Sequence, residues 1–443
     1  VPVADNGCEG NAFTVTVTVN PEPVVANQTK TVCSDAAVAL TLATDANTPT
    51  VATYNITSIT DNSLVASAGS PAIGTGLANS VIFDDKWTNT TGANVNVVYT
   101  IVPVATTTGC LGDPFTATIT INPEPIVTNQ TATVCSDIAL NLNLADLISG
   151  TGDTYSYTVS SSNQGSVPAG AARSTASALN ITNTYNNVTG SDVIMTYTVT
   201  PYGVNGCAGN TFTYTVTVKS EPVGIAGTAE SCSSVPLNIV LDDADVSNNM
   251  TGVNYAWVAN VNSNVGGEGS GTGSITETLT NVTTANSDVT YVITPSVSGC
   301  NGNNFNYVVT VKPQPVVLSQ STTVCSDIAV GLTLGNDSNG PSVATYNITS
   351  ITNNGLVAAS GSPATGTGKL ANEITNDVWT NNTPNAVDVI YTIVPVATNG
   401  CEGDAFYVTV TVNPEPVVAN QTATVCSDVA TAVNFGIDGN GPS

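Results

Sequence analysis

Ten cysteines in a strict register constrain the fold of this chain more than any other feature. Five follow a glycine, and five stand 25 residues further on, each followed by a serine, mostly within Val-Cys-Ser-Asp. Like cysteines recur at intervals of 102, 97, 93 and 101 residues. A repeat of about 100 residues is the usual length of one β-sandwich domain. The Gly-Cys cysteines are Cys8, Cys110, Cys207, Cys300 and Cys401, and the Cys-Ser cysteines are Cys33, Cys135, Cys232, Cys325 and Cys426.

Prolines mark the boundaries between the repeats. Proline lacks an amide donor and favours extended geometry in the residue before it, so it ends one strand and keeps the connection stiff. Linkers this short predict an elongated, semi-rigid rod. The pairs are Pro21/Pro23, Pro123/Pro125, Pro313/Pro315 and Pro414/Pro416, with Pro222 alone at the remaining junction.

These boundaries divide the chain into four complete modules and two tails. We expect residues 1–22 to be the C-terminal end of a preceding repeat and residues 414–443 the start of a following one. The complete modules are residues 23–122, 123–220, 221–312 and 313–413, hereafter the first to fourth modules.

Strand-like patterns dominate each module, and the fold class predicted is all-β. Thr and Val alternate near the module ends, as in Phe13–Val19, which predicts one buried and one solvated face. Trp257 and the tyrosines Tyr99, Tyr197, Tyr291 and Tyr391 are expected in the core. For the first module we predict seven strands: Val24–Val32, Ala37–Leu42, Val51–Thr60, Ser63–Ala68, Asn79–Asn89, Val95–Ala105 and Phe115–Ile121.

Composition excludes some classes of function. The net charge is −26, and the six Lys and Arg residues form no cluster, so nucleic-acid binding is not expected. The chain contains no run of 18 or more apolar residues, which predicts no membrane span. It has no histidine, so a Ser-His-Asp or Cys-His catalytic arrangement cannot form.

The motif order TVCSD, VxYTIxP, GCxGxxF and TVTVNPEP resembles the PKD-like, immunoglobulin-fold repeats of Bacteroidota cell-surface proteins. The resemblance covers nearly the whole chain. It implies a tandem array of immunoglobulin-like β-sandwiches on the cell surface. Similar repeats fill giant gliding-motility adhesins that are exported by type IX secretion.

The cysteines are expected to form structural disulfides, because no two are close enough in sequence for a zinc site. The predicted strands place each Cys-Ser cysteine at one end of a module and each Gly-Cys cysteine at the other, about 30 Å apart. A disulfide needs Cα atoms within about 7 Å. We therefore prefer bonds between neighbouring modules, Cys33–Cys207, Cys135–Cys300 and Cys232–Cys401, with the other four cysteines paired outside these residues. The rival set lies within modules: Cys33–Cys110, Cys135–Cys207, Cys232–Cys300 and Cys325–Cys401.

Two acidic features of the sequence are candidate chemical sites. Calcium is possible at Asp242, Asp243 and Asp245, but a solvated turn is favoured, and we expect no cofactor. Related positions hold Asp45, Asp146, Asp337 and Asp438. The pair Asp84/Asp85 is expected to point to opposite faces of a strand, and the fourth module repeats only Asp377, so a catalytic carboxylate pair is not expected.

Together these features predict an extracellular stalk and no enzyme. We expect a structural or adhesive role in a giant bacterial surface adhesin. The alternatives are a repeat subunit of an extracellular filament and a spacer that carries a distant enzyme or binding domain. Expected partners are surface polysaccharide, a substratum or other copies of the chain.

Overall fold

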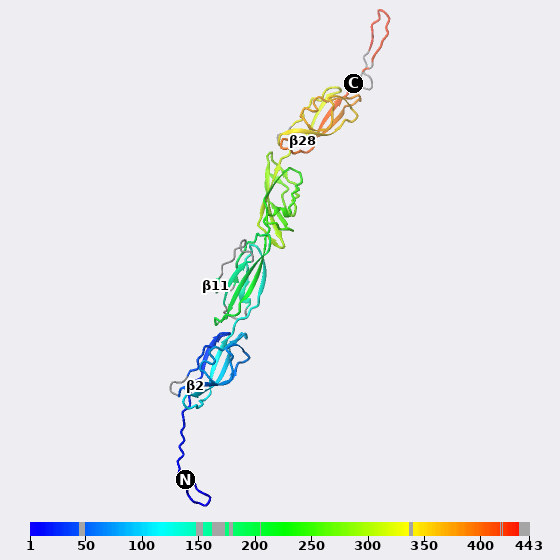
Figure 1. The fold of residues 1–443 in the computed structure, drawn as a ribbon. Helices are drawn as coiled ribbons and strands as arrows, with labels where there is room; N and C mark the ends of the chain where they lie inside the picture. The colour runs from blue at the N-terminus through cyan, green and yellow to red at the C-terminus, as the bar shows by residue number, and fades with distance from the viewer. Residues whose placement is uncertain are drawn as a thin grey trace. The chain divides into compact units, whose positions relative to one another are not determined.

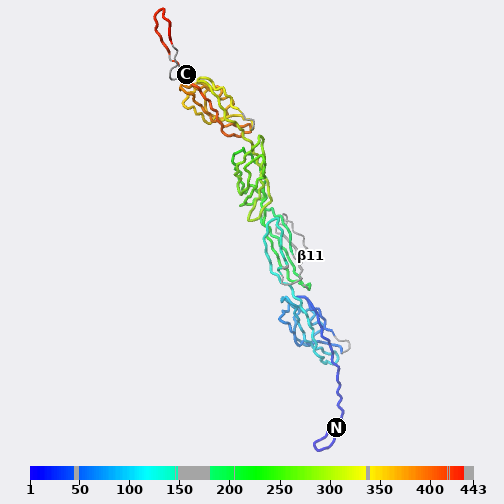
Figure 2. Tube along the Cα trace, turned by 180° about the vertical axis from the view of Figure 1, so that it is seen from behind, coloured from blue at the N-terminus to red at the C-terminus, as the bar shows by residue number. Residues whose placement is uncertain are grey.

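The computed structural model describes residues 1–43, 49–147, 154–161, 173–176, 180–203, 205–335, 340–416, 418 and 420–433. The chain divides into two compact units, Val1–Ser220 and Glu221–Ser443. Each unit contains two of the modules, which can be followed by colour in Figures 1 and 2. In the described ranges no helix is long and apolar enough to cross a bilayer.

The first module is built around one five-stranded sheet, in the order β1-β7-β6-β2-β4. β1 runs parallel to β7, whereas β6 pairs antiparallel with both β7 and β2. A second, smaller sheet pairs β3 with β5. The strands are β1 (Gln28–Cys33), β2 (Val51–Thr60), β3 (Val65–Ala68), β4 (Gly74–Leu77), β5 (Lys86–Thr88), β6 (Val95–Ala105) and β7 (Phe115–Asn122).

The second module repeats this sheet as β11-β10-β13-β14-β8, with β8 parallel to β14. The pair β9–β12 forms its smaller sheet. The elements are β8 (Gln130–Cys135), β9 (Leu142–Asn143), the short 3-10 helix η1 (Leu144–Leu147), β10 (Thr154–Ser161), β11 (Arg173–Ala176), β12 (Asn180–Ile181), β13 (Val193–Tyr202) and β14 (Phe212–Lys219).

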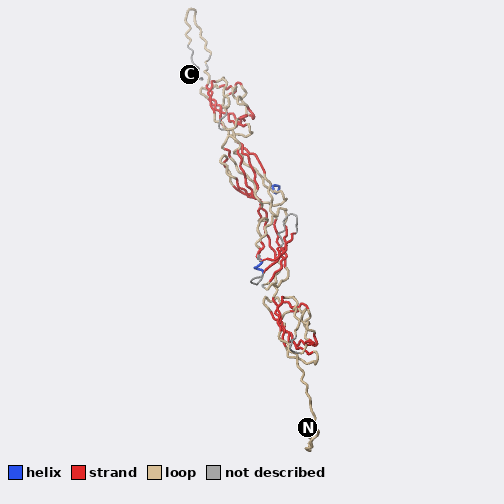
Figure 3. Tube along the Cα trace, turned by 90° about the vertical axis from the view of Figure 1, so that its left-hand side faces the viewer, coloured by secondary structure: helices blue, strands red, loops and turns tan. Residues whose placement is uncertain are grey.

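The third module has the sheet β15-β22-β20-β16-β18, with β21 paired to β20 and a small sheet of β17 and β19. Its elements are β15 (Gly227–Cys232), the 3-10 helix η2 (Asp243–Asp245), β16 (Asn254–Ala259), β17 (Val265–Gly266), β18 (Ser270–Thr272), β19 (Thr280–Asn281), β20 (Ser287–Val297), β21 (Cys300–Asn301) and β22 (Phe305–Lys312). Figure 3 shows the strands in red and the short helices in blue.

The fourth module copies the first, with a main sheet β23-β29-β28-β24-β26 and a small sheet of β25 and β27. Its strands are β23 (Gln320–Cys325), β24 (Val343–Thr352), β25 (Val357–Ser360), β26 (Gly366–Lys369), β27 (Val378–Thr380), β28 (Val387–Ala397) and β29 (Phe406–Asn413). The all-β, immunoglobulin-like class predicted from the sequence is the class observed.

Each module has its own hydrophobic core, formed by alternating residues of the long strands. In β7, Phe115, Ala117 and Ile119 are buried, while the threonines between them lie half-buried on the other face. The four strand tyrosines named above are fully buried, and Trp257 of β16 is 6% exposed. The predicted core positions of these aromatic residues are therefore confirmed.

Two predicted strands of the first module are not regular strands. The segment predicted as Ala37–Leu42 makes only scattered backbone bonds, such as Val38 N–H to the Asp85 carbonyl at 2.9 Å, and Ala39 has φ +50°. A left-handed residue interrupts the period-two ladder that a strand needs. Of the predicted strand Asn79–Asn89 only β5 forms, because turns at Val81 and Phe83 occupy its first half. The strand β4 was not predicted.

The predicted strand Phe13–Val19 in the first tail is also not formed. In a complete module the equivalent strand lies between two others, as β7 lies between β6 and β1. Among the described residues this segment pairs with neither, and Phe13, Val15, Val17 and Val19 are 64–86% exposed. Alternation alone does not form a strand without a ladder partner.

Candidate functional site: the disulfide-linked module junction

Each Gly-Cys cysteine lies on the loop between the last two long strands of its module, and this loop closes on the module's own linker. In the first module the Cys110 carbonyl accepts from Ala105 N–H and Gly112 N–H donates to the Pro103 carbonyl, both at 2.9 Å. A Cβ on Gly112 would lie 1.9 Å from the Pro23 oxygen. Only glycine allows this approach.

The same approach recurs in the other modules, which explains the second glycine of the Gly-Cys-x-Gly motif. A Cβ on the equivalent glycine would lie 1.9–2.1 Å from the linker proline oxygen in every case. The pairs are Gly209 with Pro125, Gly302 with Pro222, and Gly403 with Pro315.

In each complete module the Cys-Ser cysteine is the last residue of a strand, at the end of the module opposite the Gly-Cys loop. The serine after it fixes the position of that strand end. Ser34 N–H donates to the Asn122 carbonyl at 2.9 Å, and the Ser34 hydroxyl accepts from Asn89 N–H at 2.9 Å. We call the pair Ser34/Asn89 and its equivalents the Ser–Asn lock. The equivalents are Ser136/Asn187, Ser233/Asn281 and Ser326/Asn381.

The asparagine of each lock uses its full hydrogen-bonding capacity. The Asn89 amide donates to the carbonyls of Ile121 at 2.7 Å and Ala93 at 2.8 Å, and its oxygen accepts from the Thr91 N–H and hydroxyl. Asn89 is fully buried. A side chain with both donors and both lone pairs satisfied inside the protein fixes one local geometry. The lock therefore holds the last residues of β7 and the cysteine beside them in a defined position.

The aspartate of the Cys-Ser-Asp motif has a backbone role. Asp35, Asp137 and Asp327 have φ of 57°, 59° and 61°, a left-handed conformation that Asp tolerates better than most residues. The carboxylate of Asp35 also accepts from the Thr88 hydroxyl at 2.7 Å, as Asp327 does from Thr380 at 2.6 Å. The motif thus turns the chain sharply directly after the cysteine.

Two disulfides join the two kinds of cysteine across junctions. Cys33 bonds to Cys207 with a Cα–Cα distance of 5.4 Å, and Cys232 bonds to Cys401 with 5.6 Å. Each bond joins neighbouring modules of one unit, and both pairs belong to the preferred set. Cys135 and Cys300 are also disulfide-bonded. Among the described residues the cysteines with free thiols are Cys8, Cys110, Cys325 and Cys426.

The register of the first module argues against the rival pair Cys33–Cys110. Cys33 lies opposite Asn122, the last residue of β7, whereas Cys110 precedes Phe115, the first residue of β7. Seven residues of strand separate these ends by about 23 Å. A disulfide cannot span that distance.

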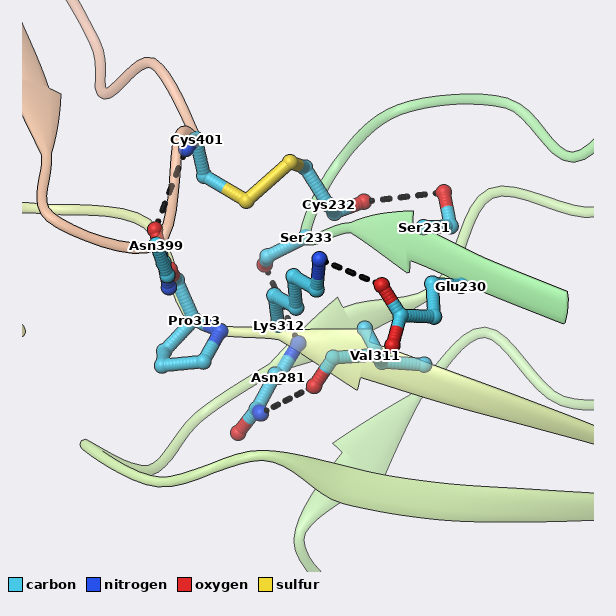
Figure 4. The surroundings of a disulfide bond; sticks show 10 residues. All are labelled: Glu230, Ser231, Cys232, Ser233, Asn281, Val311, Lys312, Pro313, Asn399 and Cys401. Carbon is cyan, nitrogen blue, oxygen red and sulfur yellow. Dashed lines mark hydrogen bonds and ion pairs between the residues drawn. A yellow bond between two sulfur atoms is a disulfide. The ribbon is translucent and has the colours of Figure 1, made fainter.

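Figure 4 shows the junction between the third and fourth modules. The Asn399 side chain donates to the linker carbonyl of Pro313 at 2.9 Å and accepts from Cys401 N–H at 3.0 Å, so it ties the linker to the bonded loop. Beside Cys232 on the neighbouring strand, Lys312 pairs with Glu230.

The junction between the first and second modules has a different linker chemistry. Glu124 lies between the two linker prolines, is 9% exposed, and donates its N–H to the Asn89 carbonyl at 3.1 Å. Burial, and then the negative charge of Asp35, raise the pKa of the Glu124 carboxyl. In the junction between the third and fourth modules Gln314 stands at this position, so that linker carries no buried acid.

The carboxylates Asp84 and Asp85 lie in different surroundings. Asp84 is exposed, whereas Asp85 is 1% exposed and its Oδ2 accepts from the Tyr99 hydroxyl at 2.7 Å. Asp377 repeats this contact with Tyr391 at 2.7 Å. Burial raises the pKa of both buried carboxyls, that of Asp377 to about 6, and burial also raises the pKa of the two tyrosines.

In the acidic cluster of the third module, the carboxylates accept hydrogen bonds from nearby backbone N–H groups. Asp242 and Asp245 form a reciprocal cap on η2, and the Asp243 carboxylate accepts from Gly252 N–H and Val253 N–H at 3.0 Å, which lowers its pKa. The described residues contain no group of three or more His, Cys, Asp or Glu that could hold a metal. Asp146 lies in η1, while Asp45, Asp337 and Asp438 lie outside the described residues.

Sequence reasoning found the cysteines but missed the lock. The serine precedes the asparagine by 48–55 residues, and each asparagine begins an Asn-x-Thr triplet. That triplet is frequent by chance in a chain rich in Asn and Thr. Position in the module separates these four triplets from the others. Each asparagine stands 30–32 residues before the next-to-last residue of its module's last strand, whose carbonyl accepts from the asparagine amide.

A family model described as the PKD-like domain matches residues 30–125, 132–222, 229–315 and 322–416. No protein in a curated set matches the chain in sequence.

Solved structures with similar tandem domains include the extracellular cadherin domains 3–6 of protocadherin gamma B2, with 11% identity, 89% of this chain and 100% of that chain covered, and a TM-score of 0.23. Drosophila N-cadherin EC1–4 has 12% identity, 88% and 99% coverage, and a TM-score of 0.21. The FN1–FN3 domains of chicken CNTN1 have 10% identity, 65% and 97% coverage, and a TM-score of 0.23.

Proposed function

We propose that this chain, which belongs to the PKD-like domain family, is an extracellular structural and adhesive stalk whose neighbouring modules are stapled by disulfides. The observation that carries the proposal is the pair of bonds Cys33–Cys207 and Cys232–Cys401, each of which joins one module to the next. A chain whose disulfides restrict the orientation of successive domains is suited to holding another domain or a partner at a distance.

The junction supports this role through two connections of different kinds. The proline linker lies against the Gly-Cys-x-Gly loop, and the disulfide joins that loop to the locked end of the preceding module. Two attachment points restrict hinge motion that a linker alone would allow. A stapled array is therefore stiffer than the same modules on their linkers.

The cysteine chemistry supports the location. Structural disulfides persist in oxidising compartments and are rare in the cytosol. We propose the connectivity Cys33–Cys207, Cys135–Cys300 and Cys232–Cys401 for the native protein. The resemblance to Bacteroidota surface repeats supports placing the stalk in a giant bacterial adhesin, with surface polysaccharide, a substratum or other copies as partners. Tandem repeats of this kind are typically non-catalytic, and we propose no reaction for the chain.

The test is a non-reducing peptide map of the intact chain that identifies the partner of Cys207. We expect the peptide that contains Cys33. A bond to Cys135 would leave each module self-contained and would overturn the stapled stalk. Small-angle scattering before and after reduction adds a second readout, in which the reduced chain should show greater flexibility.

A further inference from the structure

We propose that Cys110 and Cys325 are prebuilt halves of two further junctions, each completed by a disulfide to another module of this family. The inference rests on the proposed function and identifies the disulfide partner of each of these two cysteines. It is carried by a comparison inside the chain: the equivalents of both cysteines are disulfide-bonded in other modules.

Cys325 ends a strand that is locked in the same way as the strand of bonded Cys33. Ser326 N–H donates to the Asn413 carbonyl at 2.8 Å, and Asn381 N–H donates to the Ser326 hydroxyl at 3.0 Å. The corresponding distances at Cys33 are both 2.9 Å. The module end is therefore formed whether or not its cysteine is bonded.

Cys110 lies on a loop that matches the loop of bonded Cys401. The Cys401 carbonyl accepts from Ala397 N–H, and Gly403 N–H donates to the Pro395 carbonyl, both at 2.9 Å. The equivalent bonds in the first module have the same lengths, and Gly112 makes the same approach to its linker proline.

Exposure is what differs between the bonded and the free cysteines. Cys207 and Cys401 are each 1% exposed, whereas Cys110 is half-buried. Cys33 and Cys232 are half-buried, whereas Cys325 is exposed. The difference has the direction expected when a neighbouring module covers the cysteine, so the free ends present the surface that a neighbour covers elsewhere.

The partner of Cys325 is thus a Gly-Cys loop, and the partner of Cys110 is the locked Cys-Ser end of a module. Either can come from the same polypeptide or from a second copy of the chain. Bond formation removes two protons and two electrons from two thiols. In a glutathione buffer, one cysteine thiolate attacks oxidised glutathione and releases one glutathione; the second cysteine then attacks the mixed disulfide and releases the other.

The experiment has two arms. In the first, the unaltered chain is concentrated in a glutathione redox buffer and the peptide bonded to Cys325 is identified. In the second, a copy of the second module (residues 123–220) is fused after Asn413; the fusion keeps the linker unchanged, because Asn-Pro-Glu-Pro occurs at both 122–125 and 413–416. The matched control carries Cys207→Ser in the fused copy alone.

A Cys325–Cys110 bond between copies in the first arm supports a second copy as the source. A Cys325–Cys207 bond in the fusion, with the alkylated fraction of Cys325 falling at least tenfold relative to the control, supports a module on the same polypeptide. The inference is overturned if Cys325 stays fully alkylated in both arms while Cys33–Cys207 forms in the same molecules. If Cys33–Cys207 itself is missing, the proposed stalk fails.

Discussion

The first and third modules surround the same buried tyrosine with different side chains. In the first, Trp87 of β5 donates to the Tyr99 hydroxyl at 3.1 Å, and that hydroxyl donates to Asp85. In the third, Trp257 comes from β16 on the main sheet, packs edge-on against Tyr291 at 5.6 Å, and donates to the Gly273 carbonyl. In this third module the Tyr291 hydroxyl donates a hydrogen bond to the Glu277 carboxylate.

The ends of these two modules do not vary in this way. Asn89 and Asn281 make the same four hydrogen bonds, and the serines of both locks accept from them at 2.9 and 3.1 Å. A core can be filled by alternative side chains of similar total volume. A junction must present its cysteine at one position to a neighbouring module, so its geometry cannot drift. The contrast suggests that the repeats are constrained more at their ends than in their interiors.

Removal of one disulfide between modules should have the largest effect on the free energy of unfolding, and the effect should be equal in both units. Cys33→Ser with Cys207→Ser, or Cys232→Ser with Cys401→Ser, opens a loop of similar length, with separations of 174 and 169 residues. Chain entropy alone predicts a loss on the order of 5 kcal/mol in the free energy of unfolding. Denaturant titration of each variant measures the loss, with Cys8→Ser as the control. A loss in one unit only would show that the two junctions are not equivalent.

Removal of the lock asparagine should come next. Asn89→Ala and Asn281→Ala each remove the amide donors from a buried carbonyl, that of Ile121 or Val311, and from the carbonyl of an exposed alanine, Ala93 or Ala285. We expect each substitution to cost about 2–4 kcal/mol. Hydrogen exchange of peptides at the end of β7 and β22 reports the local loss. The exposed residues Asn94 and Asn286 provide matched alanine controls. Near-neutral results at Asn281 would contradict the idea that the lock is shared.

The buried carboxylates should give a smaller effect that depends on pH. Because the folded pKa of Asp377 is raised to about 6, the folded fourth module binds this proton more tightly than the unfolded chain. Its free energy of unfolding should therefore fall as pH rises from about 4 to about 6 and should level off above. Asp377→Asn keeps an acceptor for Tyr391 and should abolish this slope, with a gain of about 1–2 kcal/mol at pH 7.

Asp85→Asn and Glu277→Gln test the difference between the cores of the first and third modules, because each replaces the acidic partner of the buried tyrosine. Asp85 is 1% exposed and its Oδ1 has no hydrogen-bond partner among the described residues, whereas Glu277 is half-buried. We expect Asp85→Asn to stabilise the first module more than Glu277→Gln stabilises the third, because water screens the half-buried charge. Chemical denaturation across pH measures both. Equal gains would show that exposure does not set the cost of these carboxylates.

The ion pair beside the second staple should contribute least. Lys312→Asn introduces the residue found beside Cys33, namely Asn122, and removes the contact with the largely exposed Glu230. Exposed pairs contribute little, and we expect a change under about 1 kcal/mol. The same denaturant titration checks it, and a large loss would indicate that Lys312 supports the junction itself.

Long strands were predictable from the sequence because their period extends over many residues. β2 and β6 begin and end where Val51–Thr60 and Val95–Ala105 were predicted. The short strands were not, because turns and a left-handed Ala39 override the apolar pattern between Ala37 and Asn89. Local pattern cannot report such backbone choices.

The candidate site was only half predictable. The cysteine register and the expected strand ends suggested which modules are joined, since a disulfide tolerates little distance. The partners of Asn89 lie near in sequence at Ala93 and far away at Ile121 and Ser34, and nothing in an Asn-x-Thr triplet states that it is buried. A buried amide becomes recognisable only when the fold brings its distant partners together.

The Cys33–Cys207 bond also sets how far the first unit can be stretched. A pull on the chain passes from β1 through the two sulfur atoms to Cys207 and β14, so the segment between the cysteines, which spans a sequence separation of 174, lies outside the path of tension. Fully extended, that segment corresponds to about 600 Å of contour length at about 3.5 Å per residue. This length can be released only when the bond is reduced, so the redox state of the surroundings determines whether the unit behaves as an inextensible strut or as a spring.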